Sequence, residues 1–256
     1  QDGTVTEAPP QPKRLVSPDP LLDYADVKGQ HMGKRACELA AAGRHNILFI
    51  GPPGSGKTML AKRLPSILPP LTHDEAIDVY KLMSVSRHKL DASSDPQCRP
   101  FRSPHHTISY AGMVGGGRSP RPGEISLAHH GVLFLDELPE FQRTVLESLR
   151  QPLESHSITV SRANFSLNYP ANFMLVGAMN PCPCGYWGDD KKSCSCPEYR
   201  RKGYYQKLSG PLIDRIDIIC TIPRPDQDAL INQQSGADTH TSAMLKKRVV
   251  AAIQRQ

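Results

Sequence analysis

Short apolar runs alternate along the chain with segments in which apolar residues recur at helical spacing. Uninterrupted runs predict buried strands, and recurrence every three to four residues predicts helices. We therefore expect strands at residues 46–50, 132–135, 173–178 and 213–222. We expect helices at residues 26–42, 57–68, 74–83, 141–149 and 242–256, with a helical turn at 124–130. Strands that alternate with helices predict an α/β fold with a mostly parallel sheet sandwiched by helices.

Turn-forming and proline-rich segments divide these elements. Gly43 is expected to cap the first helix. Two alternating runs separated by residues 161–164 predict a β-hairpin over 157–169. Residues 1–20 hold five of the 24 prolines and are expected to form an extended linker. The polar stretch 93–123 is loop-like, and a loop of that length inside a compact domain is usually functional or mobile.

Composition and charge narrow the class of protein. The 256 residues, 38% of them apolar, suffice for one substantial core. No apolar run approaches the roughly 20 residues that cross a bilayer, which excludes a membrane-spanning protein. Lysine and arginine (31) exceed aspartate and glutamate (25), which favours a polyanionic partner only weakly. The chain begins at Gln1 without an apolar signal segment, so we expect a cytoplasmic protein that is a fragment of a longer one.

A phosphate-binding motif follows the first predicted strand. It matches the pattern G-x-x-x-x-G-K-[ST] and opens a predicted helix, as that motif requires. Its glycines let backbone N–H groups turn toward a phosphate, and the helix N-terminus favours negative charge. Lys57 is expected to bridge the β- and γ-phosphates, and the Thr58 hydroxyl to bind Mg²⁺. The motif residues are Gly51, Pro52, Pro53, Gly54, Ser55, Gly56, Lys57 and Thr58.

Four further residues complete a candidate catalytic site. Asp136 and Glu137 end the strand 132–135, where Asp136 would hold Mg²⁺ and Glu137 would polarise the attacking water. The alternative for this pair is the acidic start of a helix. Asn180 ends the third strand and could hydrogen-bond the water or the γ-phosphate, although Asn-Pro alone is only a turn. Arg215 is either an ordinary salt-bridge residue or an arginine finger that acts on a neighbouring subunit.

Several blocks of sequence together resemble the AAA+ ATPases that carry an insert in helix 2. They are the phosphate loop, residues 123–137, the strand that ends at Asn180, and residues 208–215. Two more blocks are similar to the magnesium-chelatase-like ComM/YifB family in particular. These are Arg-Pro-Phe-Arg-Ser-Pro-His-His at 99–106 and Glu-Leu-Pro-Glu-Phe at 137–141, and the resemblance runs from about residue 21 to the end.

The resemblance implies a domain plan. An AAA+ P-loop NTPase core would occupy residues 21–224, with a helix-2 insert at 99–122 and the β-hairpin before sensor-1. Residues 225–256 would be the start of a truncated helical lid. Whole members of the family also carry an N-terminal domain that resembles the Lon protease fold and a second sensor arginine in the lid. We expect both to be absent or cut short here.

The resemblance also implies an activity. Members would form a hexameric ring, hydrolyse ATP with Mg²⁺ between subunits, and act as a DNA helicase that promotes branch migration during natural transformation and homologous recombination. The Walker-type roles carry over to Lys57, Thr58, Asp136 and Glu137. The sensor-1 role falls on Asn180 and the arginine-finger role on Arg215. A protein-remodelling ATPase, like the magnesium chelatase motor subunit, is the alternative function. A non-catalytic nucleotide-gated scaffold is disfavoured because Lys57 and Glu137 are present.

Basic residues in two protruding segments are candidate DNA contacts. In relatives, the helix-2 insert and the hairpin point into the pore of the ring. Cations there would neutralise phosphates without reading sequence, so DNA binding should be salt-dependent and largely non-specific. The alternative is that these segments are solvated loops or subunit contacts. The expected DNA-binding residues are Arg99, Arg102, Arg118, Arg121 and Arg162, with His105, His106 and Asn164 beside them.

Four of the seven cysteines crowd into one loop, residues 181–203. Cys182 and Cys184 form one C-x-C pair, and Cys194 and Cys196 form another. Two such pairs can supply the four soft ligands that tetrahedral Zn²⁺ requires. The spacing is C-x-C and not the commoner C-x₂-C, so free thiols in a basic loop are the alternative. A bound zinc would be structural and would take no part in hydrolysis.

Overall fold

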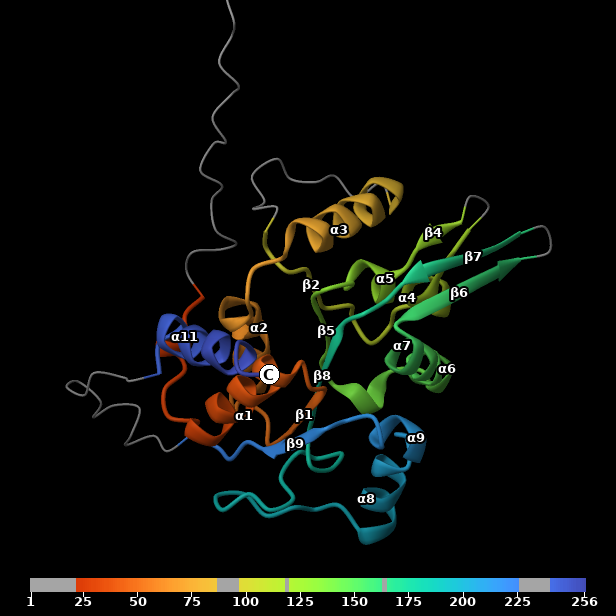
Figure 1. Ribbon diagram of the computed structural model, residues 1–256. Coiled ribbons are helices and arrows are strands. Elements are labelled where there is room, and N and C mark those ends of the chain that lie inside the picture. The colour runs from red at the N-terminus through yellow and green to blue at the C-terminus, as the bar shows by residue number, and fades with distance from the viewer. Residues whose placement is uncertain (1–21, 87–96, 118–119, 163–164, 226–239) are drawn as a thin grey trace, which may run out of the picture.

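The structure is a computed structural model and describes residues 22–86, 97–117, 120–162, 165–225 and 240–256 (Figure 1). At its centre lies a five-stranded sheet in the order β2-β5-β8-β1-β9. Every pair of neighbouring strands in this sheet is parallel, as the alternation of strands and helices predicts. The strands are β1 (Ile47–Ile50), β2 (Phe101–Arg102), β5 (Val132–Leu135), β8 (Met174–Met179) and β9 (Ile218–Thr221).

The register of the sheet brings the candidate site together. Ile50 of β1 pairs with Met179 of β8, and Leu135 of β5 pairs with Gly177. Because parallel strands share one carboxyl edge, the segments that follow β1, β5 and β8 emerge side by side. Those segments carry the phosphate loop, Asp136 and Asn180.

Side chains of the central strands alternate between two hydrophobic cores. Ile47, Phe49 and Phe134 lie on one face, and Leu48 and Leu135 lie on the other. All are at most 2% exposed. Each such side chain contributes about 1.5–3 kcal/mol relative to an exposed position. The sheet is therefore covered on both faces, which is why its strands are continuous apolar runs.

Three helices cover the first face, and their buried residues belong to the same core as Phe49 (Figure 1). They are α1 (His31–Gly43), α2 (Lys57–Ile67) and α11 (Ser242–Ile253). The helix α11 is capped by Thr241, whose hydroxyl accepts a hydrogen bond from the Met244 N–H, and it buries Leu245 and Val249. The assignment of this segment to a lid remains a prediction.

Short helices cover the second face. Their buried side chains, among them Met113, Ile125 and Val145, join the core that contains Leu48. The helix α3 (His73–Ser86) packs beside α5. The remaining elements are η1 (Tyr24–Asp26), α4 (Tyr110–Val114), α5 (Glu124–Leu127), η2 (Leu138–Glu140), α6 (Arg143–Glu147), α7 (Arg150–Ser155), α8 (Glu198–Tyr205) and α9 (Gly210–Ile213).

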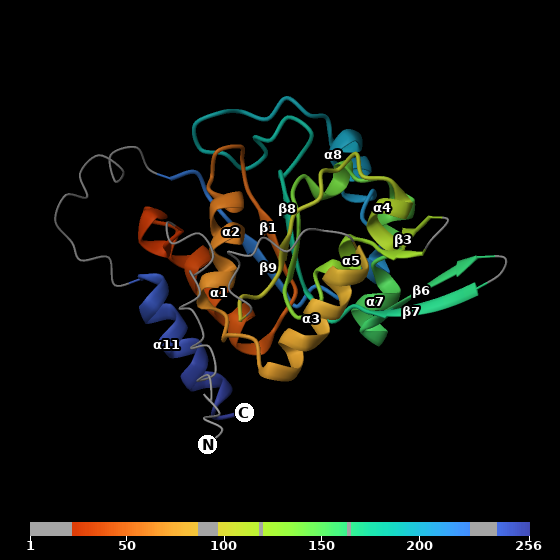
Figure 2. The same cartoon turned by 90° about the horizontal axis from the view of Figure 1, so that it is seen from above.

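Two small antiparallel pairs lie outside the central sheet. The predicted hairpin is present as β6 (Ser157–Arg162) and β7 (Phe165–Pro170). It extends away from the body of the domain in both views (Figures 1 and 2). The other pair is β3 (Gly115–Gly116) and β4 (Arg121–Pro122), within the predicted insert.

The predicted element boundaries need correction at several places. The first helix begins at His31 and not at residue 26, because Gly29 and Gln30 both have positive φ, which a right-handed helix excludes. Arg44, with φ 54°, adopts the left-handed cap expected of Gly43. The predicted helix 141–149 is the shorter α6, which ends at Glu147, and a separate helix, α7, begins at Arg150, because Pro152 has no N–H to donate to the carbonyl of residue 148.

Two further predictions place a segment in the wrong element. Residues 213–222 are not one strand, because α9 ends at Ile213 and β9 begins only at Ile218. The predicted insert 99–122 includes β2, which pairs with β5 and so belongs to the central sheet. A strand of two residues has no periodicity to detect and is defined by backbone pairing alone. The helix α8 in the cysteine-rich segment was also missed.

Some predictions fall on undescribed residues. These include the whole linker 1–20, the expected start of the core at residue 21, Arg118, Asn164 and the first part of the expected lid, residues 226–239. In the part of the chain that is described, no helix combines the length and apolar character needed to cross a membrane.

Candidate nucleotide-binding site

The phosphate loop connects β1 to α2 at the carboxyl edge of the sheet. Gly54 and Gly56 have φ values of 75° and 92°, a conformation that other residues adopt only with strain. Gly56 is also the N-cap of α2, so the loop leads directly into the helix. Backbone N–H groups at such a junction, aided by the helix dipole, suit a phosphate.

Lys57 lies inside this loop. Its side-chain ammonium donates to the carbonyls of Gly51 and Pro52, at 2.7 and 2.9 Å, and to Oδ1 of Asn180 at 3.3 Å. Burial lowers the pKa of Lys57, and the neighbouring Asp136 carboxylate opposes that shift. Because its acceptors in the loop are neutral carbonyls, they do not neutralise the positive charge of the ammonium, which can pair with a phosphate.

Thr58 and Asp136 meet across the loop. The Thr58 hydroxyl donates to Oδ2 of Asp136 at 2.7 Å, joining the first turn of α2 to the end of β5. Hydroxyl and carboxylate oxygens are ligands that Mg²⁺ prefers. The pair therefore fits the ion that the phosphate motif implies, with the predicted residues in contact.

Glu137 stands in a strained conformation next to Asp136. Its φ is 53°, in the left-handed region, and its backbone N–H donates to Oδ1 of Asp136 at 3.0 Å. A non-glycine residue in that region costs about 1–2 kcal/mol. The strain directs a side chain that is 57% exposed toward solvent, where its Oε2 lies 3.3 Å from Nδ1 of His106. No local sequence pattern predicts this contact.

Arg215 lies at the opposite edge of the sheet. Its carbonyl accepts from the side chain of Asn46, which precedes β1, whereas the phosphate loop follows β1. Four strand residues separate those two ends by about 13 Å. The Arg215 guanidinium pairs with Glu154 and donates to the carbonyl of Pro211. Arg215 is thus remote from the phosphate loop of its own chain.

Arg99 is a structural arginine and not a free cation. Its side chain is 8% exposed and pairs with Glu75 at 3.0 Å. It also donates to the carbonyls of Pro69 and His130, each at 2.7 Å. These contacts fasten the loop before β2 to the loop before α3 and to the turn before β5. These contacts disfavour the prediction that Arg99 binds DNA, because its side-chain donors already bond to groups inside the domain.

Arg102 is also bound within the domain. It makes two hydrogen bonds to the carboxylate of Glu124, at 2.6 and 2.7 Å, and its side chain is 27% exposed. Arg121, on β4, is half-buried and makes no ion pair with any residue that the structure describes. Arg162 ends β6 beside the undescribed hairpin tip, and Arg118 lies outside the described residues. Arg121 and Arg162 therefore remain as candidate DNA contacts.

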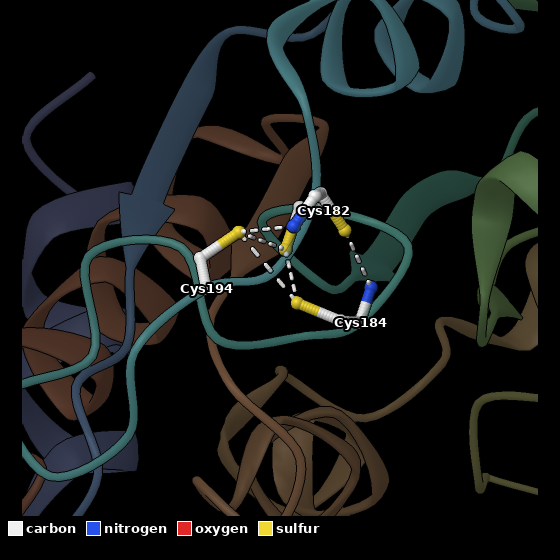
Figure 3. A group of neighbouring side chains, drawn as sticks. Cys182, Cys184 and Cys194 are labelled. Carbon is white, nitrogen blue, oxygen red and sulfur yellow. Dashed lines mark hydrogen bonds between the residues drawn. The ribbon is translucent and has the colours of Figure 1, made fainter.

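The four clustered cysteines converge on one point. The thiol sulfurs of Cys182, Cys184 and Cys194 lie 3.3–3.7 Å apart, and Figure 3 shows these side chains directed toward one another. The Cys196 sulfur completes a group whose ligand atoms all lie within 4.8 Å of one another. A tetrahedral site with Zn–S bonds of about 2.3 Å has sulfurs about 3.8 Å apart. The predicted ligand set therefore fits zinc.

Backbone N–H groups approach two of the clustered sulfurs. The Cys184 N–H points to the Cys196 sulfur and the Cys196 N–H to the Cys194 sulfur, each at 3.3 Å. Desolvation opposes ionisation of Cys184, but backbone donation from Tyr186 and contacts with the neighbouring thiols lower its pKa to about 6. Burial raises the pKa of the Cys182 thiol to about 11 and also raises that of Cys196, so of these three thiols only Cys184 favours the ionised, metal-binding form in the absence of an ion.

A second group of possible metal ligands has a different explanation. Asp78, His129 and His130 also offer ligand atoms within 4.8 Å of one another. However, Nδ1 of His129 accepts from the Asn172 N–H at 3.0 Å. Burial lowers the pKa of His129 to about 4, so its ring is neutral and its proton lies on Nε2. Neither nitrogen is then free to bind a metal, and the group is structural.

The comparisons with known proteins agree with this geometry. Residues 23–230 match the family described as magnesium chelatase, subunit ChlI. The chain belongs to that family. Its parallel sheet flanked by helices, with a phosphate loop after β1, is the AAA+ P-loop fold of the magnesium-chelatase group.

Proteins of known sequence place the chain more narrowly. It is 49% identical over 247 residues to the protein YifB of Salmonella typhimurium, and 49% identical over 229 residues to competence protein ComM of Haemophilus influenzae. These alignments cover 96% and 90% of this chain but 48% and 44% of the relatives. The chain thus spans about half the length of these relatives. The 67 kDa magnesium-chelatase subunit of Chlorobaculum parvum is 26% identical over 63% of the chain.

Proposed function

We propose that this chain is the nucleotide-hydrolysing core of an ATP-driven DNA motor. The carrying observation is the meeting of Lys57, Thr58, Asp136 and Asn180 at one edge of the sheet. Lys57 and the loop N–H groups would hold the phosphates, and Thr58 with Asp136 would hold Mg²⁺, which supplies charge neutralisation. Glu137 would orient the attacking water, and Asn180, which follows β8, would hydrogen-bond that water or the γ-phosphate.

Assembly would complete the site. Arg215 is at the far edge of the sheet from its own phosphate loop, so its charge would serve a neighbouring subunit. A head-to-tail contact that closes into a ring, expected to be a hexamer, provides that arrangement. When the ring forms, Arg215 would leave Glu154 and pair with the nucleotide phosphate of the neighbouring subunit.

Two features favour DNA as the substrate. The β6–β7 hairpin projects from the body and carries Arg162 at its outer end, as a pore element would (Figure 2). The Haemophilus relative is named a competence protein, which fits branch migration of DNA during natural transformation. Binding through a few cations would be salt-dependent and independent of sequence. We propose a cytoplasmic location for this activity.

The deciding experiment is ATP turnover by the full-length protein, with and without single-stranded DNA, at one moderate salt concentration. A Lys57→Ala protein supplies the background. Strong stimulation by DNA supports the motor. Turnover that ignores DNA but rises with a protein partner supports the alternative, a protein-remodelling ATPase, which the match to a chelatase subunit favours.

We further propose that the four clustered cysteines hold one structural Zn²⁺. The sulfur spacing fits a tetrahedral site, and no hydrolytic role follows because none of the four is a predicted catalytic residue. Elemental analysis of protein purified without chelator should find one zinc per chain. Metal-free protein that is folded would contradict the proposal.

A further inference from the structure

The cysteine loop touches the phosphate loop directly. Gly185, next to Cys184, has φ +85°, and a Cβ placed there would lie 2.8 and 2.9 Å from Cδ and Cγ of Pro53. Only a residue without a side chain permits that approach. Figure 2 shows the segment after β8 crossing the same end of the sheet as the turn between β1 and α2.

The chain itself forms a second connection. Cys182 follows Asn180 by two residues, and Oδ1 of Asn180 accepts a hydrogen bond from the Lys57 ammonium. The intervening Pro181 is buried, and its carbonyl accepts from the Tyr205 hydroxyl at 3.1 Å. A metal ligand is thereby joined to the phosphate-binding lysine through a short, packed segment.

These contacts make the position of the phosphate loop depend on the cysteine loop. A zinc ion crosslinks residues 182 and 196 and so restricts the intervening segment, including Gly185. With Gly185 fixed, Pro53 and Asn180 are held on two sides of Lys57. A site that is fixed beforehand binds its ligand with a smaller loss of conformational entropy.

We propose that zinc at the four cysteines and nucleotide at the phosphate loop bind with positive coupling, transmitted by the contact between Gly185 and Pro53. The inference rests on the zinc and nucleotide sites proposed above and does not depend on DNA. Because coupling is reciprocal, zinc strengthens nucleotide binding and nucleotide strengthens zinc binding by the same factor. The cysteine loop is then a metal-dependent support for the nucleotide site.

Zinc release provides the test. Zinc-loaded full-length protein is mixed with a chromogenic chelator selective for zinc over magnesium, with or without saturating Mg-ADP. We expect bound ADP to slow release by about fivefold or more. The converse measurement is ADP affinity before and after zinc removal, which should fall by the same factor. Equal release rates with and without ADP would overturn the coupling.

Two glycines in the loop form a matched pair of variants. Gly188 has φ +77°, close to that of Gly185, but a Cβ there would have nothing within 4 Å. Gly185→Ala and Gly188→Ala therefore introduce similar backbone strain, but only the new Cβ at residue 185 clashes with the Pro53 ring. Both should bind one zinc. Gly185→Ala alone should weaken ADP binding and abolish the effect of ADP on zinc release.

A third variant covers the case in which Gly185→Ala fails to fold. Pro53→Ala removes the Cγ and Cδ atoms from the other side of the contact and should also abolish the coupling while zinc is retained. Coupling that survives Pro53→Ala would overturn the proposal, as would equal effects of the two glycine variants. If coupling is absent while DNA still stimulates turnover, only this inference fails. If ADP does not bind at all, the proposed motor fails as well.

Discussion

The Oε2 atom of Glu137 lies 3.3 Å from Nδ1 of His106. The His106 ring lies edge-on to Phe141, with centroids 6.4 Å apart, and close to the ring of His105. Glu137 is the residue expected to orient the attacking water, and its own backbone is strained. His106 is therefore placed to position the exposed carboxylate of Glu137.

Removal of His106 should impair hydrolysis more than binding. His106→Ala leaves the Glu137 carboxylate without this partner, so we expect kcat to fall about tenfold, a part of what a positioned base contributes. His106→Asn, which can still donate a hydrogen bond, should recover some of the loss. Nucleotide affinity should be unchanged, because His106 touches none of the phosphate-loop residues. A parallel loss of affinity and kcat would indicate a general structural role.

Glu137→Gln tests the catalytic assignment itself. The amide keeps the size of the side chain and loses the negative charge that polarises water. ATP should bind normally, while hydrolysis should fall by about 10²–10⁴-fold. Single-turnover kinetics with radiolabelled ATP separate the two steps. A variant that hydrolyses at the normal rate would refute the role assigned to Glu137.

The sequence predicts those parts of the site that local motifs define. The phosphate loop, Asp136 and Asn180 each follow an apolar run, and parallel strands bring their carboxyl ends to one edge. That rule places Lys57 and Thr58 beside Asn180 and Asp136, which they contact in the structure. The cysteine pairs are equally local, since each C-x-C presents two sulfurs from one turn of chain.

Other features depend on partners that are distant in sequence. Arg99 and Arg102 are arginines in a loop-like stretch, and their acidic partners, Glu75 and Glu124, lie 24 and 22 residues away. Nothing in their own neighbourhood distinguishes a paired arginine from a free one. The edge strand β2 and the contact between His106 and Glu137 likewise arise from tertiary packing.

Arg99 and Arg121 should therefore respond differently to substitution. Arg99→Ala removes the nearest ion-pair partner of the partly buried Glu75 and the donor to two loop carbonyls, and we expect the free energy of unfolding to fall by about 2 kcal/mol. Arg121→Ala should leave stability within about 0.5 kcal/mol, because no ion pair with a described residue is lost. Urea unfolding of the two variants measures both effects.

DNA binding completes the contrast between those two arginines. If Arg121 contacts a phosphate, its loss should weaken binding equally for all sequences and reduce the salt dependence of affinity by about one counterion. Binding isotherms at several salt concentrations provide the slope. An unchanged slope for Arg121→Ala would remove this residue from the proposed DNA surface.

Arg215 requires a test that separates local packing from action on a neighbour. Arg215→Ala should bind ATP and fail to hydrolyse it, because the guanidinium would stabilise charge on the γ-phosphate of the next subunit. The matched control is Glu154→Ala, which removes the salt-bridge partner of Arg215 and should leave turnover largely intact. If both variants lose turnover equally, the ion pair itself is what matters.

Mixed assemblies then decide whether Arg215 acts between subunits. Lys57→Ala chains lack the phosphate-binding ammonium but keep Arg215, whereas Arg215→Ala chains have the reverse defect. In a mixture, an interface that joins the intact Lys57 site of one chain to the Arg215 of the other is complete. We expect ATP turnover to exceed the sum of the two separate proteins. Because Arg215 and the phosphate loop lie at opposite edges of one sheet, no rescue in a confirmed mixed ring would assign Arg215 to packing within its own chain.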